Sequence, residues 1–255
     1  MTLNNHHIPN QFGYKKSHST ESLLVRVVND ILIATDKNSA TVLLLLDLSA
    51  AFDTVDHVKL LSVLRNELGI CGSAYAWFKS YICGRTQKVK IGDDYSADVL
   101  IEFGVPQGSV LGPILFNIYI RSLYKHIKDT GFNVEGFADD HQIFKHFLPI
   151  FQITVLLDGV NKCFNVVQKW MDEYFLKLNS DKTNIILFSP SKYLQQRLTI
   201  GGTFIDNGST CIRFADDAKN LGVLFDKYLN FEPQVNKIVS SCFYIIKSLS
   251  KIRHF

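Results

Sequence analysis

Acidic residues at the ends of apolar runs are the part of this sequence best suited to chemistry. Asp47 closes the run LLLLD, and Asp139 and Asp140 lie within the stretch GFADDHQIF. A carboxylate at the end of a buried strand is costly unless a partner compensates its charge. Carboxylates gathered at one sheet edge can instead hold Mg²⁺ ions about 3.5–4 Å apart, which clamp the attacking and leaving oxygens of phosphoryl transfer. We therefore predict a metal site formed by these three residues.

A lone Asp-Asp pair is weak evidence for such a site, because most such pairs are polar surface turns. The chain offers an internal comparison, since Asp216 and Asp217 lie in a second copy, RFADDAKNLG. No acidic strand end comparable to DLSAAFD precedes this second copy at similar spacing. We expect Asp216 and Asp217 to form a solvated turn without catalytic metal.

A glycine- and proline-rich stretch, GVPQGSVLGPILFNIYI, lies between the acidic blocks at residues 104–120. Its glycines allow close backbone approach, and its prolines suit the start of a helix. Gln107 adds a side chain that can both donate and accept hydrogen bonds. The stretch is either a loop that leads into a core helix or a backbone surface against which a nucleotide or template lies.

The composition describes an ordinary globular chain. Its 255 residues are 47% apolar and 20% charged, with a formal net charge of +3 and a pI near 8.5. This composition excludes global disorder, and the mild basicity permits nucleic-acid binding without arguing for it. No apolar run is long enough to span a membrane. The five cysteines are scattered and form no C-x-x-C pair, which favours a reducing, intracellular setting over a zinc or disulfide framework (Cys71, Cys83, Cys163, Cys211 and Cys242).

Hydrophobic periodicity predicts an α+β chain with the carboxylates on strand ends or turns of one sheet. Helical spacing covers residues 19–34, 55–68, 74–83, 110–124 and 153–176, and a helical tail begins at Phe231. Strands are expected at 41–48, 134–137, 142–144 and 184–188, with a hairpin formed by 86–91 and 97–103. The tail stops at Phe255 without a cap or polar end, so we expect the chain to be a fragment.

Four blocks in order resemble the reverse transcriptase domain of non-LTR (LINE-like, jockey-type) retrotransposons: LLLLDLSAAFDTVDH, GVPQGSVLGPILFNIYI, GFADDHQIF and LKLNSDKTN. The resemblance extends from Gln11 to the tail. It implies a right-hand polymerase palm, an antiparallel sheet with helices on one face. The implied divisions are partial fingers at 1–40, the palm at 41–230 and the start of a thumb at 231–255.

The resemblance also implies roles for the acidic block. Asp47 matches the first metal-binding aspartate, Asp139 the more direct ligand and Asp140 its partner, for two Mg²⁺ ions that Mn²⁺ could replace. Asp53 matches a second acidic residue of structural rather than metal-binding character. Phe52 matches an aromatic gate that crowds a ribose 2′-OH, the atom that separates ribonucleotides from deoxynucleotides. The alternative is that Phe52 is only a core phenylalanine on a strand-to-helix turn.

Further positions match substrate-binding residues of the family. Gln107, with the adjacent Gly108, matches the turn near the incoming nucleotide and template. Lys182 matches a lysine that assists pyrophosphate departure, although it could equally be a solvated lysine. The sequence departs from the family pattern at two positions. Lys15 stands where an arginine meets the triphosphate, which should weaken nucleotide binding. Phe137 replaces a tyrosine, which should tune the activity rather than abolish it. The segment AKNLGVLFD resembles the primer grip, in which Leu221 and Gly222 press on the primer strand.

These matches imply an RNA-directed DNA polymerase, a nucleotidyltransferase that adds deoxynucleotides to a primer 3′-OH. Its expected partners are an RNA template, a DNA primer and dNTPs. The alternative is a catalytically inactive retrotransposon remnant that at most binds nucleic acid. A primer–template affinity that falls steeply with salt, without nucleotide incorporation, would favour the remnant.

Overall fold

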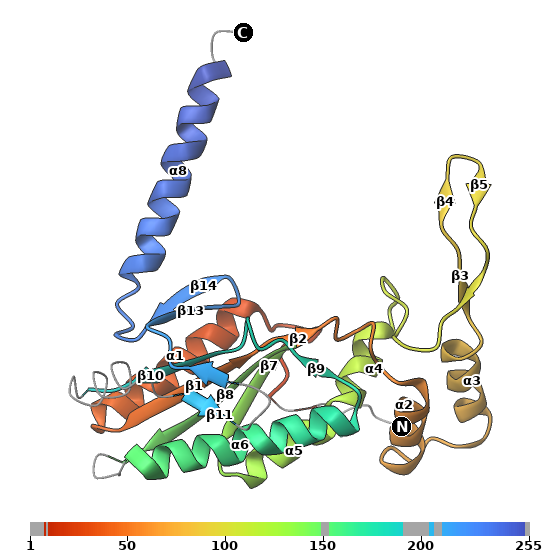
Figure 1. Cartoon of the computed structure of the whole chain (residues 1–255), viewed down its shortest axis with the longest axis horizontal. Coiled ribbons are helices and arrows are strands. Elements are labelled where there is room, and N and C mark those ends of the chain that lie inside the picture. The colour runs from red at the N-terminus through yellow and green to blue at the C-terminus, as the bar shows by residue number, and fades with distance from the viewer. Residues whose placement is uncertain (1–7, 9, 149–152, 191–203, 207–210, 253–255) are drawn as a thin grey trace.

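A four-stranded antiparallel sheet forms the centre of the computed structural model (Figure 1), which describes residues 8, 10–148, 153–190, 204–206 and 211–252. The order of its strands is β10-β1-β8-β7. The helices are α1 (Thr20–Asp36), α2 (His57–Asn66), α3 (Gly72–Ile82), α4 (Gly112–Tyr119), α5 (Arg121–Asp129), α6 (Ile153–Glu173) and α8 (Glu232–Ile252). The strands are β1 (Ala40–Leu46), β2 (Leu48–Ser49), β3 (Thr86–Gln87), β4 (Lys90–Ile91), β5 (Asp94–Tyr95), β6 (Val99–Leu100), β7 (Asn133–Phe137), β8 (Asp140–Phe147), β9 (Lys177–Leu178), β10 (Asn184–Phe188), β11 (Phe204–Asp206), β12 (Cys211–Arg213), β13 (Asp217–Asn220) and β14 (Val223–Asp226).

Strand β1 is buried along its whole length, as its unbroken apolar run predicts. Val42 and Leu44 pack in a cluster with α2, α4, α5 and α6, whereas Leu43 and Leu45 pack with α1 and the β13–β14 hairpin. Figure 1 shows α5 and α6 below the sheet and the β13–β14 hairpin above it. The α+β palm class is confirmed. The expectation of helices on one face is incomplete, because the apolar side of α1 covers the opposite face.

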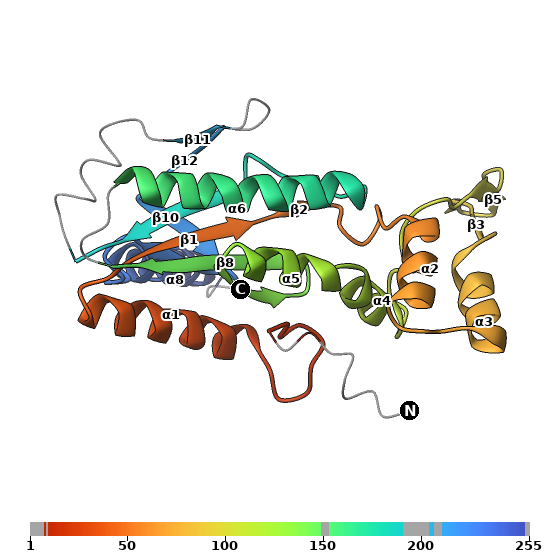
Figure 2. The same cartoon turned by 90° about the horizontal axis from the view of Figure 1, so that it is seen from below.

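Two predicted elements are interrupted in the structure. The strand expected at 41–48 divides into β1 and β2, and Asp47 lies at the break. The helix expected at 110–124 divides into α4 and α5 at Ile120. The hairpin expected at 86–103 is present as the β3–β6 and β4–β5 pairs, which lie with α3 at one end of the molecule (Figures 1 and 2).

The second Asp-Asp copy does not form the expected solvated turn. Asp217 is the first residue of β13, and Asp216 Oδ1 lies 2.7 Å from Lys227 Nζ in a hairpin ion pair. That hydrogen bond raises the pKa of the Lys227 ammonium group. Both aspartates remain exposed, as we expected. Strand pairing explains the difference, since Asp217 lies opposite Asp226 on β14.

The far end of the described chain is a long, exposed helix. Helix α8 projects away from the sheet in Figure 1 and has no buried residue. None of the helices in the described residues is long and apolar enough to cross a membrane. The cysteines described with their side chains, Cys71, Cys83, Cys163 and Cys242, are all free thiols, and Cys211 is outside that set.

Glu135 on β7 is a buried acid, 2% exposed, whose Oε1 lies 3.0 Å from Arg26 Nη2 on α1. Burial raises the pKa of the carboxyl group from 4.5 to about 7; Arg26 opposes the shift and Asp30 adds to it. Between pH 4.5 and about 7, the Glu135 carboxyl group keeps its proton in the native state but has lost it in the unfolded chain. The stability contributed by Glu135 is therefore fully present below about pH 4.5 and lost as the pH rises through 7.

We predict that the free energy of unfolding of the wild type, relative to Glu135→Gln, falls by up to about 3 kcal/mol as the pH rises from 4.5 to 8. Urea unfolding at several pH values measures this difference. Glu102→Gln, at an exposed position, provides the control. A difference that stayed constant across this range would contradict the burial argument.

Candidate active site

The three predicted metal-binding aspartates meet at one edge of the central sheet. Leu46 at the end of β1 pairs with His141 on β8, so the antiparallel register places Asp47, the next residue, across from Asp140. Asp139 belongs to the tight β7–β8 connection, because Phe137 pairs directly with Asp140. Residues distant in sequence therefore share this edge because β1 and β8 are neighbouring strands.

These aspartates line a cleft of about 830 Å³. The same cleft contains Lys182, Leu221 and Gly222, so the structure brings the acidic edge together with the predicted primer-grip residues and one predicted substrate residue. Among the described residues, the lining is Thr20, Asp47, Phe137, Ala138, Asp139, Asp140, Asp181, Lys182, Asn184, Lys219, Leu221 and Gly222. The lining does not include Lys15, Phe52, Gln107 or Gly108.

The carboxylates in the cleft are electrostatically coupled. Although Asp140 is exposed as a residue, partial burial of its carboxyl group raises the pKa to about 6, with Asp139 and Asp47 adding to the shift and Lys182 opposing it. Lys182 Nζ lies 3.8 Å from Asp47 Oδ2. A cation bound here would relieve the repulsion among the three carboxylates.

The donor set suits a hard divalent cation, because Mg²⁺ prefers oxygen ligands and commonly uses one or two carboxylates together with substrate phosphates. Within the described part of the chain, no group of three or more His, Cys, Asp or Glu side chains converges closely enough to hold a metal by itself. A metal at this edge would therefore need further oxygen ligands besides these carboxylates.

Phe52 lies on the turn after β2, with its ring centroid 4.4 Å from that of Phe116 on α4. It is partly buried against the core, so the structure supports its packing role while leaving part of the ring accessible. Tyr14 also contacts it, edge to face, with centroids 6.4 Å apart.

The glycine- and proline-rich loop is bonded to the turn that carries Phe52. Gln107 Nε2 donates to Asp53 Oδ1 at 2.6 Å, and Val105 N donates to the carbonyl oxygen of Phe52 at 2.9 Å. A Cβ on Gly104 would lie 3.0 Å from the Asp53 backbone. Asp53 therefore joins two loops, in agreement with a structural role. Gly108 adopts φ +73°, in the left-handed region.

Tyr14 is a largely exposed residue near the acidic edge that the sequence reasoning did not consider, and it does not line the cleft. Burial and the negative charge of Asp139 raise the pKa of its phenol. Tyr14 therefore lies near both Asp139 and Phe52, and the half-buried Lys15 is the next residue of the same segment. The sequence could have pointed to Tyr14, because in QFGYKK it directly precedes Lys15, the predicted triphosphate contact.

Leu221 and Gly222 form the tight turn of the β13–β14 hairpin, with Asn220 paired to Val223. Their φ values are +46° and +94°. Two positive φ values are typical of a type I′ hairpin turn, whose twist matches that of the flanking strands. The turn presents this pair to the cleft beside the aspartates.

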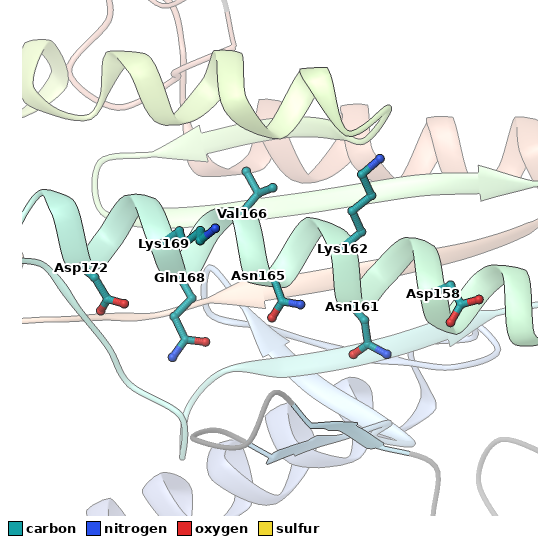
Figure 3. Close-up of a pocket in the computed structure, with 8 residues that line it drawn as sticks. All are labelled: Asp158, Asn161, Lys162, Asn165, Val166, Gln168, Lys169 and Asp172. Carbon is teal, nitrogen blue, oxygen red and sulfur yellow. The ribbon is translucent and has the colours of Figure 1, made fainter.

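A second hollow, of about 690 Å³, lies along α6 and contains none of the predicted site residues (Figure 3). The described part of its lining comes from that helix and mixes two aspartates and two lysines with amides and a valine. A single helix face with interspersed charges is typical of a solvated surface. We therefore place the candidate active site in the cleft that contains Asp47, Asp139 and Asp140.

Comparisons with known proteins identify the family to which the chain is similar. Residues 1–223 match the family model described as "Reverse transcriptase (RNA-dependent DNA polymerase)". The chain is 29% identical over 237 residues to the RNA-directed DNA polymerase from mobile element jockey of Drosophila funebris, covering 91% of this chain and 24% of that protein. It is 30% identical over 251 residues to the probable RNA-directed DNA polymerase from transposon X-element of Drosophila melanogaster, covering 95% and 26% respectively.

The chain thus spans about a quarter of the length of these curated relatives. Among solved structures, apo telomerase from Candida tropicalis, truncated from its C-terminal domain, aligns with a TM-score of 0.58 and 14% identity. That alignment covers 88% of this chain and 40% of the telomerase chain. At this level of identity, the likeness shows a shared fold.

Proposed function

Because the chain belongs to the reverse transcriptase (RNA-dependent DNA polymerase) family, we propose that it adds deoxynucleotides to the 3′-OH of a DNA primer on an RNA template. The observation that carries this proposal is the meeting of Asp47, Asp139 and Asp140 at one sheet edge, in a cleft that also contains the Leu221-Gly222 turn. The adjacent acidic oxygens would hold the metal ions of such a reaction. The hairpin turn would contact the primer strand.

Asp47 and Asp139, with Asp140 as partner, would hold two Mg²⁺ ions, or Mn²⁺ in their place. When bound, the metal would lower the pKa of the primer 3′-OH and neutralise negative charge that develops on the pyrophosphate. Burial is the main cause of the raised pKa of Asp140, and the charges of Asp139 and Asp47 add to it; a divalent cation would relieve that repulsion among the carboxylates.

The chain's own residues would position the reactants. Lys182, 3.8 Å from Asp47, places a positive charge where a departing phosphate would lie. Leu221 and Gly222 would press on the primer end, and Lys15 would approach the triphosphate as a point charge. Gln107, with Gly108, would shape the nucleotide side of the site by holding the Asp53 turn.

We propose the same division of the chain as the sequence indicates, with partial fingers at 1–40, the palm at 41–230 and the start of a thumb at 231–255. Helix α1, within the first part, packs on the palm sheet through Leu23 and Val27.

The free cysteines favour an intracellular site of action.

The test of this function is extension of a labelled DNA primer annealed to RNA by the full 255-residue chain. We expect extension that follows the template sequence, requires Mg²⁺ and stops on chelation with EDTA. Salt-sensitive primer–template binding without any incorporation would instead identify an inactive remnant.

Phe52→Val should raise incorporation of ribonucleotides relative to deoxynucleotides by about 10- to 100-fold, because the smaller side chain leaves room for a 2′-OH. Single-nucleotide kcat/KM values with dNTP and rNTP measure the effect. Phe103→Val, at a half-exposed aromatic position in the neighbouring loop, is the control. Unchanged sugar selectivity in folded Phe52→Val protein would show that Phe52 only packs the core.

A further inference from the structure

The connection between β7 and β8 contains an unusual backbone conformation. Ala138, the residue before Asp139, has φ +58°, in the left-handed region. This conformation costs a non-glycine residue about 1–2 kcal/mol, and hairpin turns that require it usually use glycine. An alanine is stable there only if surrounding groups hold it in place.

The side chain of Gln11 makes the required contacts. Its Nε2 donates to the carbonyl oxygen of Ala138 at 2.9 Å, and its Oε1 accepts from the Ala138 N–H at 2.9 Å. One buried side-chain amide therefore bonds both backbone polar groups of the left-handed residue. Gln11 is 4% exposed, so water competes little for these bonds.

The remaining hydrogen-bonding capacity of the Gln11 amide fixes its own orientation. Oε1 also accepts from Gly13 N at 2.9 Å, and Nε2 lies 3.3 Å from the Tyr124 hydroxyl oxygen. Both donors and both acceptor positions of the amide are thus used. The surrounding backbone is also paired, since Phe12 N donates to Gly136 O at 2.7 Å and Gly136 N to Asn10 O at 2.9 Å.

We propose that Gln11 is a positioning residue for the catalytic turn: its amide holds Ala138 in the left-handed conformation and so fixes the direction in which Asp139 and Asp140 leave the sheet. This inference rests on the proposed function. Gln11 does not line the cleft, and its two bonds to Ala138 are its link to the acidic turn. A displacement of about 1 Å at a reacting centre can cost on the order of 100-fold in rate. A small change in the backbone of this turn would therefore be enough to slow nucleotide addition.

Gln11→Ala should lower kcat for nucleotide addition by about 10- to 100-fold while changing KM for dNTP by less than about threefold. Gln11→Met, which keeps the side-chain volume without the hydrogen bonds, should behave alike and covers the possibility that the alanine variant does not fold. Asn10→Ala is the matched control. It removes another bond from the same segment to β7, between Asn10 Nδ2 and Val134 O at 2.9 Å, without touching Ala138.

A second substitution separates positioning from general support of the fold. Glycine adopts the left-handed conformation without strain, so adding Ala138→Gly to Gln11→Ala should restore at least about threefold of the lost kcat. Hydrogen exchange supplies a readout independent of activity, because the Ala138 N–H should exchange faster once its Gln11 acceptor is removed.

Wild-type kcat and unchanged Ala138 exchange in folded Gln11 variants would overturn the proposal. An Asn10→Ala loss equal to that of Gln11→Ala, or failure of Ala138→Gly to restore any activity, would also overturn it. If the wild-type chain itself did not extend primers, the proposed function would fail, and the exchange measurement would still decide whether Gln11 holds the turn.

Discussion

Asp139→Asn should reduce nucleotide incorporation by on the order of 1,000-fold or more, with little change in the unfolding transition. Asparagine keeps the shape of the side chain but removes the negative charge that we propose would hold a cation at the sheet edge. Asp47→Asn should have a comparable effect, because Asp47, directly after β1, supplies the carboxylate that faces Asp140. Rapid-quench measurement of single-nucleotide addition, with Mg²⁺ at several concentrations, determines the loss.

The second Asp-Asp copy provides a matched control for this experiment. Asp217→Asn makes the same chemical change in the second FADD, at the position equivalent to Asp140, which is exposed at the start of β13; the residue equivalent to Asp139, Asp216, is in an ion pair with Lys227. We expect this variant to retain incorporation within about twofold of the wild type, since Asp217 pairs with Asp226 on β14 and does not line the cleft. Activity of Asp139→Asn within tenfold of wild type would contradict the assignment of the metal site.

Gly136→Ala should destabilise the protein by about 3 kcal/mol, the second large effect that we expect. A Cβ at this position would overlap the Tyr124 hydroxyl oxygen, and it would also lie 3.2 Å from Gln11 Nε2. Tyr124 is buried on α5, so its ring has little room to move away. The backbone of Gly136 is not in the left-handed region, so steric overlap and not backbone strain is the cause. Urea unfolding monitored by circular dichroism measures the loss.

Two variants test the steric explanation for Gly136. Tyr124→Phe removes the overlapping oxygen, so the Gly136→Ala/Tyr124→Phe double variant should recover a large part of the lost stability. Gly159→Ala, in the interior of α6, is the control, because its new Cβ would meet the Phe147 ring at an ordinary 3.8 Å. That change should stabilise the protein by about 0.5–1 kcal/mol. A Gly136→Ala protein as stable as wild type would contradict the overlap.

The sequence was sufficient for elements whose pattern is local. The unbroken apolar run of β1 predicted a strand buried on both faces, and β10 was predicted at residues 184–188, where it lies. The helices were predicted with small errors at their ends, because capping and fraying depend on a few residues. The sequence missed the break at Ile120, since α4 and α5 share one apolar pattern.

The site was predicted partly from spacing and partly from the resemblance, and the structure brings its acidic members together. Asp47 faces Asp140 because β1 and β8 pair in one register, and a shift by one residue would turn the side chains to the other face of the sheet. Lys182 and the Leu221-Gly222 turn share the same cleft. Their catalytic roles remain predictions that the substitutions above test.

The sequence by itself determined which segments are strands and helices and which acidic residues end a buried run, because side-chain periodicity is a local property of the chain. Only the tertiary structure decided which face α1 covers, that Gln107 bonds Asp53, and that Gln11 holds Ala138. These contacts join segments far apart in the sequence, and no local pattern encodes which distant groups meet. FADD at Phe137–Asp140 therefore differs from its second copy through its neighbours in space: the facing Asp47, directly after β1, and the Gln11 amide behind the turn.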